Sequence, residues 1–340
     1  MKSFSSGKVS IWIWLFLFLV GCPPSSPPLP STPAVTGWQT QKSGVETALG
    51  GIYFLDARNG WISGNNGIIL QTKDGGEQWS IQESGTPHPL VSIFFTDPQK
   101  GWAVGEKGTI VHTSDGGQRW VLQESGQPKR SLMHVFFTDP ERGWVVGEKG
   151  ILLSTTDGGQ HWSSVEVRPP VAFNAVFFVN QKQGWISGDA GNIFYTDDAG
   201  AHWIRQESGT DKDLHRIFFI RPEVGWAVGG NGTILHTTDG GKTWASQVSG
   251  VPAFLLALSF ADDQAGWVVG ASGTILRTTD GGKTWRQQPS GTIDFLINVL
   301  AIEPQVGWIV GKKGMILHTK QGGDPPAEEK KEATVEAATK

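Results

Sequence analysis

Residues 233–244 read TILHTTDGGKTW, and residues 274–285 repeat the stretch as TILRTTDGGKTW. An apolar run before Thr-x-Asp-Gly-Gly is typical of a short strand that ends in a tight turn, because glycine accepts positive φ and an Asp side chain bonds the amides that follow it. Five such turns occur, and a sixth has Ala199 in place of the first glycine; their aspartates are Asp74, Asp115, Asp157, Asp198, Asp239 and Asp280. We interpret these aspartates as structural residues of their turns.

A second landmark, Gly-Trp, precedes each of these turns and occurs once more near the C-terminal end. Its tryptophans, separated by 41 or 42 residues, are Trp61, Trp102, Trp144, Trp185, Trp226, Trp267 and Trp308. In the second copy, we expect strands at residues 90–96, 102–105, 109–113 and 119–123. Four short strands in each of seven repeats predict an all-β fold, a seven-bladed β-propeller of four-stranded antiparallel blades.

The seventh copy stops at Gly323 and lacks the fourth strand of the others. Residues 37–41 (GWQTQ) resemble that strand, as the comparison with TWRQQ at residues 284–288 shows. We therefore expect the N-terminal strand to complete the last blade, because a closed ring leaves no open sheet edge. The propeller is predicted to span residues 37–323 as one domain.

Composition excludes several classes of protein. The chain has 340 residues, and its single cysteine excludes a disulfide framework and a cysteine-based metal centre. The net charge of −4 gives no general attraction to nucleic acid. His112, His236 and His318 share one repeat position, and equivalent positions of separate blades point apart. We expect no metal, no cofactor, no nucleic-acid partner and a monomer.

The sequence also argues against catalysis. No Ser-His-Asp set, phosphate loop or cysteine nucleophile is present. A sialidase needs a tyrosine nucleophile, and of the two tyrosines Tyr53 aligns with Phe94 of the next repeat, so we interpret it as a core residue. The alternative left open is a carbohydrate-binding or glycan-cleaving propeller that uses Asp211, Asp213 and Asp294 on one rim.

Residues that break the repeat are the candidates for binding a partner. The inserted residue of the 42-residue step lies in the loop that contains Lys129 and Arg130, and neighbouring hairpins carry Lys107 and Lys149. His134 and the pair His215 and Arg216 lie on inner strands, where they could face the central channel. We expect these basic residues, Lys107, Lys129, Arg130, Lys149, His215 and Arg216, to contact an acidic or extended protein segment.

The segments outside the propeller predict a targeting signal and a membrane anchor. Residues 1–21 read as a signal peptide with an apolar core at residues 11–20. Leu19-Val20-Gly21-Cys22 resembles the lipobox of bacterial lipoproteins, which implies lipid attachment to Cys22; an ordinary signal peptide with a chance cysteine is the alternative. Residues 22–36 form a Pro-rich spacer and residues 324–340 a disordered tail. We expect an extracytoplasmic protein, anchored to a membrane by its lipid.

The repeats resemble Asp-box propellers, and among these the photosystem II stability/assembly-factor family most closely, through the Gly-Trp strand and the GTIL-x-TTDGGKTW run. The resemblance implies a seven-bladed ring and an assembly factor that binds newly made reaction-centre protein in the thylakoid lumen. It does not locate a binding surface by a local motif. We expect a membrane-anchored, non-catalytic protein-binding propeller; a purely structural envelope lipoprotein is a further alternative.

Overall fold

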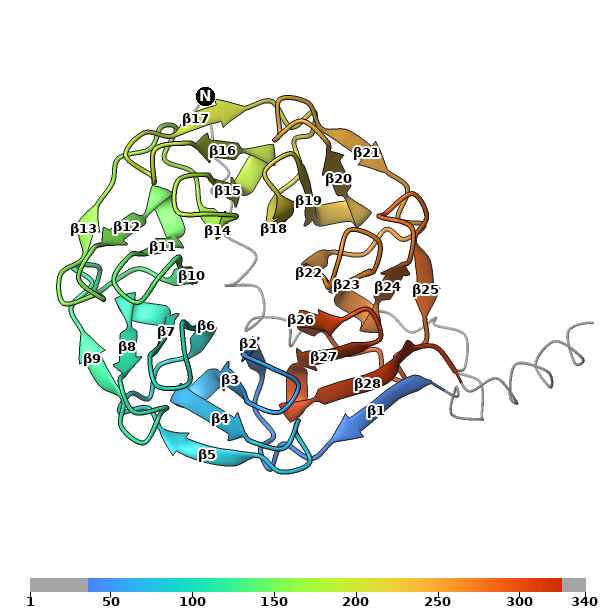
Figure 1. Cartoon of the computed structure of the whole chain (residues 1–340), viewed down its shortest axis with the longest axis horizontal. Helices are drawn as coiled ribbons and strands as arrows, with labels where there is room; N and C mark the ends of the chain where they lie inside the picture. The colour runs from blue at the N-terminus through green and yellow to red at the C-terminus, as the bar shows by residue number, and fades with distance from the viewer. Residues whose placement is uncertain (1–35, 326–340) are drawn as a thin grey trace, which may run out of the picture. The chain divides into compact units, whose positions relative to one another are not determined.

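The computed structural model describes residues 36–325, which form seven four-stranded antiparallel sheets arranged around a central channel (Figure 1). The predicted fold class is therefore confirmed. The predicted signal peptide, Cys22, nearly all of the spacer and all but two residues of the predicted tail lie outside the described residues.

Two inner strands of each blade build the channel wall and the core. The innermost strands are β2 (Leu49–Phe54), β6 (Leu90–Phe95), β10 (Leu132–Phe137), β14 (Phe173–Phe178), β18 (Leu214–Arg221), β22 (Leu255–Phe260) and β26 (Leu296–Glu303). The second strands, which carry Gly-Trp, are β3 (Gly60–Gly64), β7 (Gly101–Gly105), β11 (Gly143–Gly147), β15 (Gly184–Gly188), β19 (Val224–Gly229), β23 (Gly266–Gly270) and β27 (Val306–Gly311).

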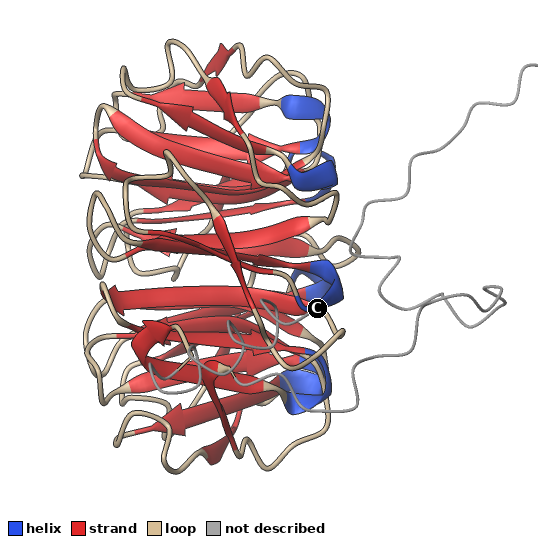
Figure 2. Ribbon diagram, turned by 90° about the vertical axis from the view of Figure 1, so that its right-hand side faces the viewer, coloured by secondary structure: helices blue, strands red, loops and turns tan. Residues whose placement is uncertain are grey.

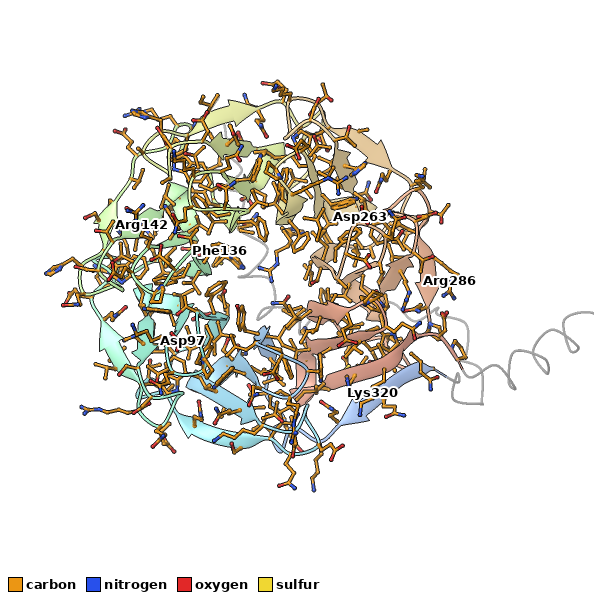
Figure 3. The ribbon with its side chains drawn as sticks, in the orientation of Figure 1. Asp97, Phe136, Arg142, Asp263, Arg286 and Lys320 are labelled. Carbon is orange, nitrogen blue, oxygen red and sulfur yellow. The ribbon has the colours of Figure 1, made fainter. Side chains whose placement is uncertain are left out.

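The two outer strands of each blade follow. The third strands are β4 (Ile68–Thr72), β8 (Ile110–Thr113), β12 (Leu152–Thr155), β16 (Ile193–Thr196), β20 (Ile234–Thr237), β24 (Ile275–Thr278) and β28 (Ile316–Gly323). The fourth strands are β5 (Ser80–Glu83), β9 (Val121–Gln123), β13 (Ser163–Ser164), β17 (Ile204–Gln206), β21 (Ala245–Gln247), β25 (Arg286–Gln288) and, in blade 7, β1 (Gly37–Gln41). Figure 3 shows Arg286 at this outer edge and Phe136 beside the channel.

The ring has two different faces. Short 3-10 turns join the second and third strands, and they all lie on the face that we call the hairpin face (Figure 2). These turns are η1 (Asn65–Gly67), η2 (Glu106–Gly108), η3 (Glu148–Gly150), η4 (Asp189–Gly191), η5 (Gly230–Gly232), η6 (Ala271–Gly273) and η7 (Lys312–Gly314). The turns with the repeated aspartates join the third and fourth strands, so they lie on the opposite face, the Asp-box face.

The core lies between neighbouring blades. The Gly-Trp ring of one blade stacks on a phenylalanine of the next blade's innermost strand; Trp185 and Phe219, for example, have centroids 3.6 Å apart. Six junctions carry this stack, with separations of 3.6 to 4.1 Å. Each stacked pair contributes roughly 0.5–1.5 kcal/mol beyond its buried area. The repeat therefore stabilises the contacts between blades as well as the blades themselves.

The ring is closed by its first strand, as predicted. Strand β1 pairs antiparallel with β28, and Gly37 lies opposite Gly323. Trp38 of this strand donates a hydrogen bond from Nε1 to Gln288 Oε1 in blade 6, at 3.2 Å. Its ring also contacts Trp267 edge-on, with centroids 6.0 Å apart. At this seventh junction Ala301 replaces the stacked phenylalanine, and the N-terminal strand supplies the aromatic contact instead.

Candidate functional site

The repeated aspartates are used inside their own turns. Thr237 Oγ1 donates to Asp239 Oδ1 at 2.8 Å and accepts from the Gly241 amide at 2.9 Å. Hydrogen bonds from the side chain and amide of Thr243 lower the pKa of Asp239 to about 2. The bond from threonine to aspartate recurs in all six copies, at 2.8 Å. This geometry is that of a turn, not of carboxylates converging on a substrate.

Four of the predicted binding residues gather on the hairpin face at the junction of blades 2 and 3. We call Lys107, Lys129, Arg130 and Lys149 the basic patch. The loop with Lys129 and Arg130 is held by both hairpins, because Gly108 N donates to Arg130 O at 2.6 Å and Glu148 N donates to Ser131 O at 3.1 Å.

The basic patch is accessible, although Glu106 and Glu148 of the same hairpins offset part of its charge. Lys107, Lys129 and Lys149 are exposed, and Arg130 is half-buried. No ion pair involves any of the four within residues 36–325. Lys107 and Lys149 each hold a left-handed backbone, with φ of 54° and 55°. The patch can therefore attract a negatively charged segment over the hairpin face.

The acidic residues that were considered for glycan chemistry are engaged elsewhere on the hairpin face. Asp211 pairs with Lys212 at 2.7 Å, and Asp294 pairs with Lys313 at 3.0 Å. Asp213 Oδ1 accepts the Ala190 amide at 2.8 Å. Each aspartate thus serves a local contact of its own, and the structure does not bring the three together as an acid–base pair.

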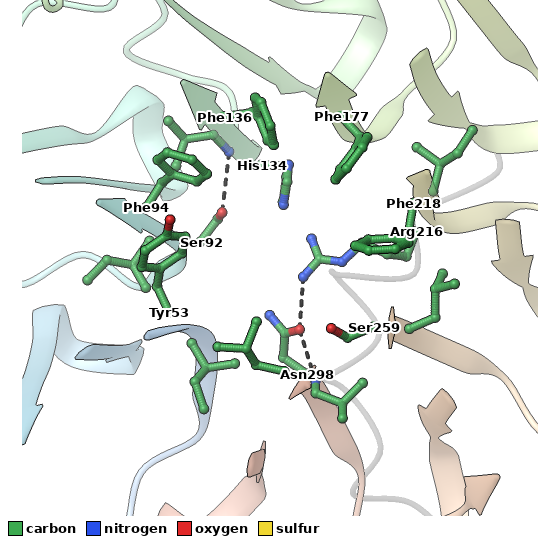
Figure 4. A pocket seen from close by; sticks show the side chains of 17 residues that line it. Tyr53, Ser92, Phe94, His134, Phe136, Phe177, Arg216, Phe218, Ser259 and Asn298 are labelled. Carbon is green, nitrogen blue, oxygen red and sulfur yellow. Dashed lines mark hydrogen bonds between the residues drawn. The ribbon is translucent and has the colours of Figure 1, made fainter. Parts of the chain in front are cut away.

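The central channel contains a cavity of about 320 Å³ with an aromatic collar (Figure 4). The collar consists of Tyr53, Phe94, Phe136, Phe177 and Phe218, with neighbouring centroids 4.8 to 5.3 Å apart. Tyr53, predicted to lie in the core, packs half-buried against the core cluster that contains Trp61 and Phe95, and it also lines the channel. Burial raises the pKa of Tyr53 to about 12.

Beside the collar lies a polar layer, formed by Ser92, His134, Arg216 and Asn298. Arg216 Nη2 donates to Asn298 Oδ1 at 2.8 Å, and Asn298 Nδ2 donates to Gly50 O at 3.0 Å. Burial lowers the pKa of Arg216 to about 10. Burial, and then the charge of Arg216, lower the pKa of His134 well below its usual range, so that its imidazole is neutral.

The other histidines do not join this layer. His215 is buried, and its Nδ1 lies 2.8 Å from Leu255 O. His112, His236 and His318 stack on Trp102, Trp226 and Trp308 of their own blades. Within the described range, no group of three His, Cys, Asp or Glu residues is arranged to hold a metal ion.

The six predicted binding residues therefore divide into three places: four in the basic patch, Arg216 in the channel and His215 in the interior. Sequence reasoning missed the collar and Ser259, although a signal existed. All collar residues occupy the same position of the repeat, and this position lies on the side of the strand opposite the apolar core positions. In residues 36–325, no helix is long and apolar enough to cross a membrane.

Comparison with known families and structures gives a consistent result. The family model described as "Photosynthesis system II assembly factor YCF48" matches residues 31–121, 81–206 and 247–328, which is more than half of the chain. No curated protein sequence matches significantly.

Solved structures of the same fold include members of that family. "YCF48 bound to D1 peptide" has a TM-score of 0.71 and 22% identity, covering 87% of this chain and 99% of that one. YCF48 from Cyanidioschyzon merolae has a TM-score of 0.70 and 21% identity, covering 83% and 98%. The WD40 repeats of RRP9 reach a TM-score of 0.71 at 8% identity, covering 83% and 96%. At identities this low, the likeness shows the shared propeller fold.

Proposed function

Because the chain belongs to the photosynthesis system II assembly factor YCF48 family, we propose that it is a non-catalytic assembly or stability factor that binds an exposed segment of a membrane protein. The family match over most of the propeller is the observation that carries this proposal. The related YCF48 of known structure was solved with a D1 peptide. In a photosynthetic organism, the partner proposed here is a photosystem II protein.

The basic patch is the proposed contact surface. Lys107, Lys129 and Lys149 are exposed in neighbouring loops of the hairpin face, and none of them forms an ion pair among the described residues. Arg and Lys side chains in such a cluster form charge-assisted hydrogen bonds with carboxylates. An acidic, extended segment of a partner is therefore the ligand that this surface fits best.

Substitutions taken from the chain's own repeats test this surface. Asn66 and Asn231 occupy in η1 and η5 the left-handed position of Lys107 and Lys149. The double variant Lys107→Asn/Lys149→Asn therefore removes two charges and keeps the backbone. Lys313→Asn is the matched control, because Lys313 holds the same position in η7, with φ 57°, and pairs with Asp294.

The measurement is capture of membrane proteins from solubilised membranes by the purified full chain. We expect the wild type and Lys313→Asn to capture the same protein in similar amounts. The amount captured by the double variant should be at least tenfold lower. Repeated capture of glycans instead of protein would contradict the proposal. Equal capture by the double variant would mean that the partner contacts a surface other than the basic patch.

The anchor is a separate part of the proposal. We propose that lipid on Cys22 holds the propeller at the extracytoplasmic side of a membrane, on the spacer of residues 22–36. The order of signal-like segment, cysteine and proline-rich stretch supports it. Cys22→Ser should transfer the protein from the membrane fraction to the soluble fraction after cell lysis. Retention of the variant in the membrane would exclude the lipid as the anchor.

A further inference from the structure

The polar groups of the channel use their acceptor atoms to join neighbouring blades. Three side chains each accept an amide N–H from the following blade. These bonds run from Val135 N to Ser92 Oγ (3.3 Å), from Val176 N to His134 Nδ1 (3.4 Å) and from Ala301 N to Ser259 Oγ (3.0 Å). The wall itself thus uses one acceptor site of each of these three side chains.

The charged or N–H and O–H groups left for the cavity are donors. A serine whose oxygen accepts a bond still has its O–H, and a neutral imidazole that accepts at Nδ1 carries its proton on Nε2. Arg216 has five N–H groups, one of which goes to Asn298. In Figure 4, the side chains of His134 and Arg216, from blades 3 and 5, point toward the same space.

The cavity also has an unbalanced charge. None of the described residues that line it is Asp or Glu. Among the described residues, the hydrogen-bond partner of Arg216 is the neutral amide of Asn298. A half-buried guanidinium without a counter-ion loses part of its hydration, and a carboxylate that binds it in two parallel hydrogen bonds offsets that cost. The lining therefore favours an anion over a neutral or cationic ligand.

We propose that the central channel is a carboxylate-binding site, in which Arg216 and the Nε2–H of His134 hold the carboxylate and the aromatic collar receives the attached carbon skeleton. A volume of about 320 Å³ fits a small organic acid or the last residue of a peptide chain. This site does not depend on the function proposed above, because its test uses no protein partner.

The test measures binding of phenylacetate to the full chain, purified in detergent, by calorimetric titration and by ligand-observed NMR at pH 7. Phenylacetamide is the uncharged analogue. We expect saturable binding of phenylacetate, at least tenfold tighter than that of the amide. Absence of saturable phenylacetate binding, or equal binding of both compounds, would overturn the proposal.

Variants assign the site to Arg216. Arg216→Gln removes the charge and should weaken phenylacetate binding at least tenfold, whereas Arg216→Lys keeps the charge but not the paired hydrogen bonds and should weaken binding less than Arg216→Gln. Arg221→Gln is the matched control, since Arg221 lies exposed at the end of the same strand and pairs with Asp263 at 3.4 Å. Unchanged binding in Arg216→Gln would refute the assignment. If Arg216→Gln does not fold, a folded His134→Phe variant replaces it. We expect this variant to lose phenylacetate binding, and wild-type affinity in it would overturn the proposal.

A pair of peptides distinguishes two possible sources of the carboxylate, a chain terminus and a free organic acid. A short peptide with an apolar C-terminal residue is titrated with a free carboxylate and with a C-terminal amide. Tighter binding of the free acid than of phenylacetate identifies a chain terminus as the ligand class. Binding of phenylacetate alone identifies a free organic acid. Either result supports a carboxylate site, and competition by phenylacetate places the peptide in the channel.

Discussion

The Asp-box turns and the channel positions of the innermost strands belong to the same ring. The turns keep the same residues from blade to blade, whereas the channel positions do not. All six turns have a threonine and an aspartate joined at 2.8 Å. At one channel position, by contrast, the seven blades carry Gly51, Ser92, His134, Ala175, Arg216, Ala257 and Asn298. A turn must satisfy the same backbone groups in every blade, whereas no common contact constrains a side chain that faces the channel. Repetition therefore marks structure, and variation marks the place where a ligand can be recognised.

The largest expected effect comes from removing a whole strand from the repeat. Deleting residues 37–42 removes β1 and with it the contact between Trp38 and Trp267. We expect a loss on the order of 3–5 kcal/mol or more in the free energy of unfolding, because a large aromatic side chain leaves the core and β28 becomes an open edge. Circular-dichroism melting measures it. A deletion of residues 330–335 is the control, and an unchanged Tm for the first deletion would refute the closure.

The second-largest loss of stability is expected from a substitution in one of the repeated turns. Thr237→Val keeps the shape of a buried side chain but removes its bonds to Asp239 and from the Gly241 amide. Leaving that amide unpaired should cost about 1–3 kcal/mol. Thr238→Val is the matched control, since Thr238 is the exposed neighbour. Denaturant unfolding of both variants decides the question; equal midpoints would mean that the turn does not need its threonine.

Acid should weaken the turns together. Hydrogen bonds from His161 and His202, and from the Thr243 side chain and amide, lower the pKa of Asp157, Asp198 and Asp239 to about 2, from an ordinary value of 3.8. Because these pKa values are lower in the folded state, the stabilisation is present above about pH 4 and is lost as the pH falls toward 2.

Thermal melting between pH 5 and pH 2 measures this loss. Replacing the three aspartates with asparagine should flatten the decline in Tm over that range. A decline of the same steepness in the triple variant would show that other carboxylates are responsible.

Replacing a channel residue should change stability less than replacing the turn threonine. Arg216→Ala introduces the residue that Ala175 and Ala257 supply at the same position in blades 4 and 6. It removes a half-buried charge whose hydrogen-bond partner is a neutral amide, so we expect the Tm to stay close to the wild-type value or to rise. A fall larger than that of Thr237→Val would mean that Arg216 is a structural residue.

The smallest effect on stability is expected in the basic patch. Lys107→Asn places at φ 54° a residue that tolerates the left-handed conformation, so the free energy of unfolding should change by less than about 0.5 kcal/mol. Urea unfolding measures this change. A larger loss would show that the side chain of Lys107 supports the fold, and its effect on partner capture could not then be read as binding.

The fold could be predicted because its decisive contacts repeat at one spacing. Gly-Trp at each step predicts the second strand, and its stacked contact with the next blade makes that residue necessary. The closure was also predictable, since residues 37–41 match the missing strand. These features depend on local patterns, which a single sequence contains.

The candidate site could be predicted only in part. His215 and Arg216 are neighbours on one strand, so their side chains point to opposite sides. His215 lies in the interior while Arg216 enters the channel. The sequence places the two residues on opposite sides of the strand but does not contain a signal for which of them faces the channel. The basic patch likewise depends on bonds between loops of different blades, so its residues could be proposed but not placed together.

The pairing of β1 with β28 also has a consequence for biosynthesis. Of the described strands, β1 is translated first and its partner β28 is translated after all the others. A contact between such distant residues is slow to form, because a long loop has to close before any bond is gained. The early strand must therefore wait with unpaired amides and carbonyls until β28 has been made, and during that interval the chain is most exposed to misassembly with other nascent chains.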